Sequence, residues 1–208
     1  MKIQIKKILF LSTCIYALNY NHDIVGKTPA APAPLKQRRL GSNNYGTHIF
    51  ALLAAVLNTT GPILEMGCGN FSTPLLHAVC SVNKRFLLSV EADTEWLKLF
   101  TNFVTDWHQF KLVPVISKKE CQAWDNVGNE KHWSVVLIDH TPVVRRGIDI
   151  MRLRQNTDIF VIHDSQNPKP YGYDKIYPPF KYSYTYDVFF PTTTLLSDVI
   201  DVAAFFRE

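Results

Sequence analysis

Short, continuously apolar runs recur along the chain, and they are typical of strands covered on both faces of a parallel sheet. The clearest run, at residues 133–138, has the sequence Trp-Ser-Val-Val-Leu-Ile. Other apolar residues recur at helical spacing, as at Trp96, Phe100 and Val104. This alternation predicts an α/β sheet. Its first five strands are expected at residues 63–65, 86–90, 111–116, 133–138 and 159–162.

The chain changes character after the fifth predicted strand. Residues 171–186 are rich in Tyr, Pro and Lys and predict a loop or lid, whereas residues 184–190 and 192–199 predict two β segments joined at Pro191. Helices are expected at residues 45–57, 72–80, 94–107 and 145–154. The whole pattern predicts a single Rossmann-like α/β domain with a seven-stranded mixed sheet, in which five parallel strand–helix units precede a C-terminal antiparallel pair.

Length and composition are consistent with one well-packed domain. The 208 residues are 47% hydrophobic, which is too little chain for two large domains. The net charge of +4 is a mild excess without a dense basic stripe, so nucleic acid is not indicated as a partner. The four cysteines show no CxxC spacing, which argues against a structural zinc site.

The N-terminal segment leaves two possibilities open. Residues 1–25 contain lysines followed by an apolar run at residues 8–18, which is shorter than the ~20 residues of a spanning helix but fits a signal peptide or anchor. Residues 26–44 predict a Pro/Ala-rich linker before the domain at residues 45–208. The protein is then expected in the secretory pathway or tethered to a membrane. If residues 8–18 have no such role, a cytoplasmic protein is expected.

The segment Gly61-Pro-Ile-Leu-Glu-Met-Gly-Cys-Gly-Asn-Phe-Ser-Thr73 predicts a strand, a tight glycine turn and the start of a helix. Such a turn brings backbone N–H groups close to a nucleotide-like ligand. The carboxylate of Glu65, two residues before Gly67, favours a cationic ligand over a pyrophosphate. Ser72 stands where the dinucleotide pattern has its third glycine. These residues favour S-adenosylmethionine (SAM), with its sulfonium and ammonium groups, over NAD.

Four predicted strands end in acidic residues, namely Glu65, Glu91, Asp139 and Asp164. Ligands of doubly wound sheets bind outside the carboxyl ends of the strands. Glu91 follows the glycine turn by roughly 20 residues, the spacing at which an acid receives ribose hydroxyls. A helix N-terminal charge is the alternative role for Glu91.

The Glu-x-Gly-x-Gly turn and the acids after the second and fourth strands resemble class I SAM-dependent methyltransferases. Segments such as Gly46-Thr-His48 and Val161-Ile-His-Asp-Ser165 look like a group of little-characterised methyltransferase-like proteins. The resemblance covers nearly all of the chain from Tyr45 onward. It implies that SAM is bound by a set of residues near the strand ends. The methionine part would contact Glu65, Gly67, Gly69 and Ser72, the ribose would contact Glu91, and Asp139 completes the cofactor-binding set.

A further resemblance is to the metal-dependent, catechol-type O-methyltransferases. Ile138-Asp-His140 and Asp164-Ser165 occupy the places of that family's metal-binding motifs. By this resemblance Asp139 and Asp164 would bind Mg²⁺ or another divalent cation. Two departures are that Ser165 replaces the family's Asn ligand and Pro142 its basic lysine. The strand-five His-Asp element also resembles plant glucuronoxylan O-methyltransferases, which implies a glycan acceptor.

The candidate catalytic residues are His140, His163 and Asp164. Histidine titrates near working pH and suits a general base, although each histidine could instead only hydrogen-bond to backbone. Arg145 and Arg146 are candidates for binding an acidic acceptor.

The leading hypothesis is a SAM-dependent O-methyltransferase that acts on a hydroxyl of a small molecule or glycan, with a divalent metal as a possible aid. The alternative is a non-catalytic binding or scaffold protein on the same fold, because fold does not guarantee chemistry. An NAD-dependent oxidoreductase is disfavoured by Glu65. The acceptor and the oligomeric state stay open.

Overall fold

The computed structural model describes residues 46–115, 120–169 and 171–207. The predicted N-terminal segments 1–25 and 26–44 therefore lie outside the described residues. Among the helices of the described ranges, none combines the length and the apolar character needed to cross a bilayer.

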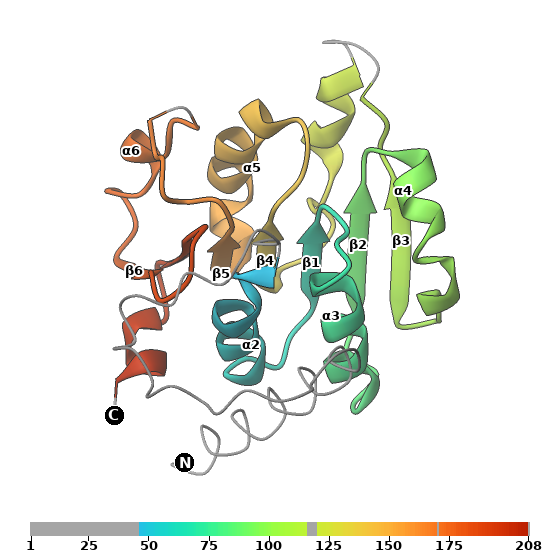
Figure 1. The fold of residues 1–208 in the computed structure, drawn as a ribbon, viewed down its shortest axis with the longest axis horizontal. Helices are drawn as coiled ribbons and strands as arrows, with labels where there is room; N and C mark the ends of the chain where they lie inside the picture. The colour runs from blue at the N-terminus through green and yellow to red at the C-terminus, as the bar shows by residue number, and fades with distance from the viewer. Residues whose placement is uncertain (1–45, 116–119, 170, 208) are drawn as a thin grey trace, which may run out of the picture. The chain divides into compact units, whose positions relative to one another are not determined.

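A mixed sheet with the strand order β3-β2-β1-β4-β5-β7-β6 forms the centre of the fold (Figure 1). The first five strands pair in parallel, and β7 pairs antiparallel with both β5 and β6. This arrangement confirms the predicted seven-stranded mixed sheet with its C-terminal antiparallel pair. The strands are β1 (Ile63–Met66), β2 (Leu87–Glu91), β3 (His108–Leu112), β4 (Trp133–Ile138), β5 (Thr157–Ile162), β6 (Tyr182–Tyr186) and β7 (Thr193–Ser197).

Five α-helices and five 3-10 helices of the described ranges surround this sheet. The α-helices are α2 (Ile49–Leu57), α3 (Ser72–Ser81), α4 (Thr94–Lys98), α5 (Arg146–Leu153) and α6 (Tyr173–Ile176). The 3-10 helices are η3 (Thr101–Phe103), η4 (Glu120–Asn126), η5 (Val143–Arg145), η6 (Arg154–Asn156) and η7 (Val202–Phe206).

Two predicted segments differ from the observed ones. The helix expected at residues 94–107 ends at Lys98 and gives way to η3, and the third strand begins at His108 rather than Lys111. Val104, which contributed to the apolar pattern, is more than half exposed, and Trp96 is 37% exposed, so their spacing does not report burial against the sheet. The expected loop at residues 171–186 contains α6 and β6. The three tyrosines of β6 occupy alternate positions and are partly buried, whereas the residues between them are exposed, as is typical of a strand.

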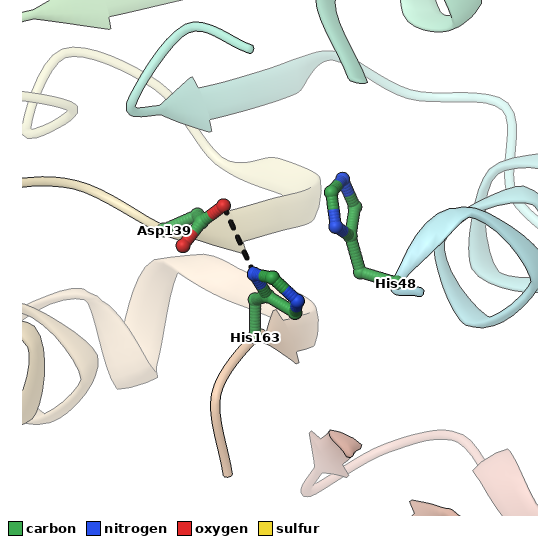
Figure 2. Close-up of side chains that lie close together, drawn as sticks. All are labelled: His48, Asp139 and His163. Carbon is green, nitrogen blue, oxygen red and sulfur yellow. Dashed lines mark hydrogen bonds and ion pairs between the residues drawn. The ribbon is translucent and has the colours of Figure 1, made fainter. Parts of the chain in front are cut away.

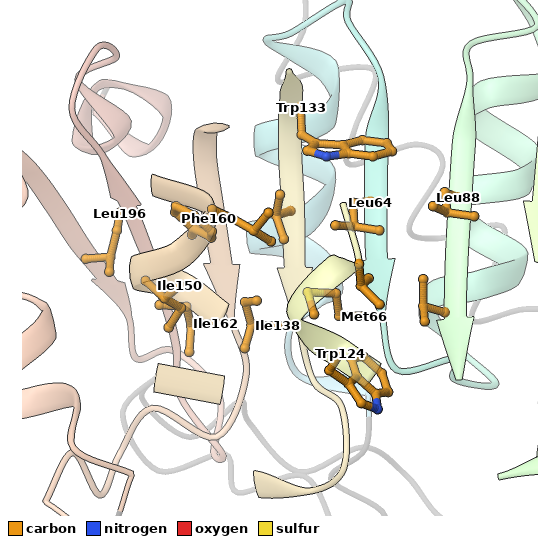
Figure 3. Close-up of a cluster of buried hydrophobic side chains, with 14 of the residues drawn as sticks. Leu64, Met66, Leu88, Trp124, Trp133, Ile138, Ile150, Phe160, Ile162 and Leu196 are labelled. Carbon is orange, nitrogen blue, oxygen red and sulfur yellow. The ribbon is translucent and has the colours of Figure 1, made fainter. Parts of the chain in front are cut away.

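Each face of the sheet is covered by its own apolar cluster. On one face, strand residues such as Leu64, Ile138 and Phe160 pack with Ile150 of α5 and Trp124 of η4 (Figure 3). On the other face, the alternate strand residues pack with α2, α3 and η7. Burial on both faces explains why the central strands are continuously apolar.

The strand order reverses direction between β1 and β4, which lie side by side in the sheet. The chain continues from β1 toward one edge of the sheet and from β4 toward the other edge. Such a reversal leaves a crevice at the carboxyl ends of the two strands. The glycine turn follows β1, and Asp139 follows β4. The fold thereby brings the two predicted site segments to one edge of the sheet.

Candidate cofactor and acceptor site

A cavity of about 880 Å³ lies at the carboxyl ends of the central strands. Residues after β1, β2, β4 and β5 line it, together with Trp96 of α4 and Arg146 of α5. The predicted site residues in this lining are Gly67, Glu91, Asp139, His140, His163 and Asp164. Glu65, Gly69 and Ser72 are not in the lining: Glu65 lies in β1, Gly69 in the glycine turn and Ser72 at the start of α3.

The backbone of Gly67 packs closely against the backbone of Asp139 and His140, which follow β4. Its φ is +93°, a conformation that residues with a Cβ rarely adopt. A Cβ at this position would lie 2.6 Å from the carbonyl oxygen of Asp139. The turn therefore requires glycine both for its conformation and for the close approach.

Glu65 is buried under the glycine turn rather than exposed to the cavity. Its carboxylate accepts hydrogen bonds from the hydroxyls of Thr73 (2.9 Å) and Ser89 (2.5 Å). Thr73 Oγ1 also accepts a bond from the N–H of Gly69 at 3.0 Å, so Glu65 supports the turn through Thr73. Burial raises the pKa of Glu65 to about 7, although these hydroxyls lower it in part.

Glu91 is held rigidly at the rim of the cavity. Its carboxylate accepts backbone N–H groups from Cys68 (2.9 Å), Ala92 (2.6 Å) and Asp93 (3.0 Å). Asp93 in turn caps the start of α4. The indole N–H of Trp96 donates to the carbonyl of Cys68 at 2.8 Å, which ties an aromatic wall to the glycine turn. These residues and the glycine turn are called the cofactor half of the cavity.

Arg146 organises the opposite part of the cavity, called the acceptor half. Its Nη2 lies 3.0 Å from Asp139 Oδ1, and its Nη1 lies 3.4 Å from Asp164 Oδ2. Its Nε donates to the carbonyl of His140 at 2.9 Å. Burial would raise the pKa of Asp139, but the hydrogen bond and charge of His163, together with Arg146, outweigh burial and lower it.

This arrangement does not fit the ligand set of the catechol-type enzymes, in which two acids face one cation. The guanidinium of Arg146 already supplies positive charge to both Asp139 and Asp164. A cation shared by these two acids alone would have to displace Arg146. Arg145 is also engaged within the protein, by Asp125 at 2.6 Å and Asp149 at 2.8 Å, and it does not line the cavity.

His163 lies beside Asp139, and His48 faces both (Figure 2). His163 Nδ1 is 3.1 Å from Asp139 Oδ2, and its Nε2 is 3.1 Å from the hydroxyl of Thr47. The rings of His48 and His163 have centroids 4.5 Å apart. Burial and the neighbouring His163 lower the pKa of His48 to about 4, so His48 is neutral at pH 7.

His140 lies at the back of the acceptor half. Its Nε2 is 3.0 Å from Asp149 Oδ2, and its ring stacks on Trp124 at a centroid distance of 4.7 Å. Burial lowers the pKa of His140, although Asp149 opposes this effect. Since Arg146 binds the carbonyl of His140, these contacts position Arg146 at the cavity.

Sequence reasoning did not single out Thr73, Trp96 or His48 as site residues. His48 is about 90 positions from Asp139, and only the fold brings the two together. Thr73 carried a detectable signal, since a hydroxyl one position into α3 is placed to bond back to the glycine turn. His48 ends the segment Gly46-Thr-His48, which carries the methyltransferase-like resemblance, but that resemblance assigned it no role in the site.

No family model and no curated protein matches the chain by sequence. Solved structures match it by fold. A Klebsiella pneumoniae protein provisionally named an O-methyltransferase is 13% identical, with a TM-score of 0.58 over 91% of this chain and 96% of that one. Human methyltransferase-like protein 13, solved in complex with SAH, is 14% identical, with a TM-score of 0.52 over 76% of this chain and 83% of that one. The chain thus has the fold of class I SAM-dependent methyltransferases.

Proposed function

We propose that the protein is a SAM-dependent methyltransferase that methylates a hydroxyl oxygen of a small molecule or a glycan. The observation that carries this proposal is that one cavity is lined by Glu91 and Trp96 on one side and by Asp139 and Asp164 on the other. The bound SAH of human methyltransferase-like protein 13 supports SAM as the cofactor of this fold.

The cofactor half suits the adenosine part of SAM. A carboxylate offers about four acceptor sites, and three backbone N–H groups occupy the carboxylate of Glu91. At least one acceptor site of Glu91 is therefore left for a ribose hydroxyl. Trp96 supplies an aromatic surface in the same lining for the adenine ring. The methionine part would then extend along the glycine turn toward Asp139.

The acceptor half suits the transfer step. In that step the methyl group leaves the sulfonium sulfur and bonds to the acceptor oxygen, while the hydroxyl proton moves to a carboxylate and SAH remains. Asp164 is the proposed proton acceptor, because it lines the cavity and its side chain is 30% exposed. Its φ of +58° is uncommon outside glycine but is tolerated by aspartate, and such conformations cluster at functional sites.

His163 and Asp139 would hold the acceptor hydroxyl near the methyl group. The low pKa of Asp139 keeps this carboxylate ionised at pH 7, so it can accept a hydrogen bond from the acceptor. His140 would act through Arg146 as a positioning residue. Correct placement of the two reacting atoms accounts for much of the acceleration in such a transfer.

The test combines SAM titration calorimetry with a radiolabelled methyl-transfer screen of phenols, catechols, sugars and uronic acids, using the full chain. Micromolar SAM binding and transfer to a hydroxyl acceptor are expected. Asp164→Asn should lower turnover by about 100-fold or more while SAM affinity stays the same. The exposed Asp174→Asn is the matched control and should behave like the wild type.

Two outcomes would contradict the proposal. Absence of SAM binding would reject the methyltransferase function. SAM binding without transfer to any acceptor would favour the non-catalytic binding or scaffold protein.

A further inference from the structure

Three side chains from distant parts of the chain converge at the acceptor half. His48 precedes α2, Asp139 follows β4, and His163 follows β5 (Figure 2). Each offers one nitrogen or oxygen ligand atom, and these atoms lie within 4.8 Å of one another. A metal ion with bonds of about 2.1 Å separates two of its ligand atoms by at most about 4.2 Å. Small side-chain rotations would therefore bring all three atoms onto one ion.

The hydrogen-bond partners of Thr47 indicate that Nε2 of His163 has a proton. The hydroxyl of Thr47 donates its only hydrogen to the carbonyl of Pro191, at 2.8 Å. In its 3.1 Å contact with His163 Nε2, this hydroxyl must therefore accept, and Nε2 must have the proton. A neutral ring would then direct the lone pair of Nδ1 toward Asp139 Oδ2, 3.1 Å away, whereas a doubly protonated ring would donate a hydrogen bond there. Two facing lone pairs require a cation between them.

His48 distinguishes a metal ion from a second proton on His163. The His48 side chain is 2% exposed, and neither of its ring nitrogens has a hydrogen-bond partner within the described ranges. Buried polar groups nearly always have a partner. An added proton would satisfy the contact between His163 and Asp139 but would leave His48 without one. A metal ion would bind one ring nitrogen of His48 together with the facing atoms of Asp139 and His163, which a proton on His163 alone does not do.

The surroundings also suit a metal site. Ligating histidines usually donate their second ring N–H to an orienting group, and Thr47 receives that bond from His163. Arg146 contacts Oδ1 of Asp139 and leaves Oδ2 for an ion. Two imidazoles and one carboxylate favour first-row transition metals, whereas Mg²⁺ and Ca²⁺ prefer oxygen ligands.

From this geometry we propose that His48, Asp139 and His163 bind one divalent transition-metal ion. Asp139 and His163 also line the cavity, so an ion bound by them would lie beside it. An acceptor hydroxyl bound there would have a lowered pKa, and Asp164 lies beside it, with Oδ1 3.9 Å from His163 Nδ1. This last role rests on the proposed function, whereas metal binding itself does not.

The experiment uses the full chain, without a histidine tag, after treatment with a chelator and in the absence of SAM. Co²⁺ is titrated as the probe while its visible absorption is recorded, and the bound metal is measured after dialysis. One Co²⁺ per chain is expected, displaced by Zn²⁺ but not by Mg²⁺. His48→Gln should weaken Co²⁺ binding by about 100-fold or more, and Thr47→Val by about 10-fold or more.

The matched control is His132→Gln, since the His132 side chain is 58% exposed and pairs with Asp158, away from the three proposed ligands. It should bind Co²⁺ like the wild type. Thermal melting of each variant shows whether it is folded. Absence of stoichiometric Co²⁺ binding, or equal binding by folded His48→Gln, would overturn the metal site. SAM titration of the same preparations tests the cofactor separately, so failure of one proposal is distinguishable from failure of the other.

Discussion

The two halves of the cavity are built in different ways. In the cofactor half, the carboxylates of Glu65 and Glu91 are satisfied by hydroxyls and backbone N–H groups of adjoining segments. In the acceptor half, Asp139 and Asp164 are held by the side chain of Arg146, and His48 has no hydrogen-bond partner among the described residues.

This difference indicates that the two halves are preorganised for ligands to different degrees. The carboxylates of the cofactor half are held by several hydrogen bonds without a ligand, so its shape is set before a ligand arrives and little ordering cost is expected on binding. In the acceptor half both ring nitrogens of His48 are buried and have no hydrogen-bond partner among the described residues, which is unusual for buried polar groups. The cofactor half is therefore expected to respond to backbone changes, and the acceptor half to changes of charge.

Gly67→Ala should have the largest effect, because it distorts the backbone of the glycine turn in the cofactor half. A Cβ there combines a strained φ with a clash against backbone that cannot move aside, which together cost about 4 kcal/mol. SAM binding should be lost in calorimetry and the melting temperature should fall. Gly172→Ala is the matched control, since its φ is +70° but a Cβ would meet nothing within 4 Å. Equal effects of the two changes would contradict the close-approach explanation.

Asp149→Ala should disrupt the packing that supports the acceptor half and leave the cofactor half unchanged. Asp149 is fully buried and contacts His140, Arg145 and Arg152. Its loss leaves buried groups without a partner and should cost about 3 kcal/mol in the free energy of unfolding, measured by urea denaturation. We expect SAM affinity to change by less than about 2-fold, since Asp149 does not line the cavity. A large loss of SAM affinity would show that the two halves are coupled.

The buried carboxyl of Glu65 should make stability depend on pH. Its folded-state pKa of about 7 is raised above the ordinary value of 4.5, so its favourable contribution is complete below about pH 4.5 and is lost as pH rises through about 7. Between about pH 5.5 and about pH 8.5 this loss is about 2 kcal/mol.

The measurement is the difference in unfolding free energy between the wild type and Glu65→Gln across that range. Other buried groups titrate with the opposite sign, since burial lowers the pKa of His48 to about 4 and of His108 to about 3. Taking the difference removes the contribution of His48. A difference that does not change with pH would show that Glu65 is ionised throughout.

Glu91→Gln should have the smallest effect of the four. The amide nitrogen would face a backbone donor in place of an acceptor oxygen, and the ribose would lose a charged hydrogen-bond partner. SAM affinity should fall by about 10-fold in calorimetry. Glu95→Gln, on the exposed surface of α4, is the control and should bind SAM like the wild type. Unchanged affinity of Glu91→Gln would remove Glu91 from the ribose site.

Much of the cofactor half could be predicted because its parts are close in sequence or follow a strand. The glycine turn is a contiguous segment, and Glu91 ends the next strand. The burial of Glu65 was not predictable in the same way. Glu65 stands opposite Ser89 in the pairing of β1 with β2, on the sheet face that α3 covers, and both facts depend on register.

The sequence by itself determined the parallel strands, the terminal antiparallel pair, the glycine turn and the acids at the strand ends, because these are properties of local residue order. The tertiary structure alone decided that Arg146 joins Asp139 to Asp164, and that His48 meets His163. These contacts join segments far apart in the chain. Residue order does not reveal which distant side chains meet, because strand order and side-chain packing set those distances.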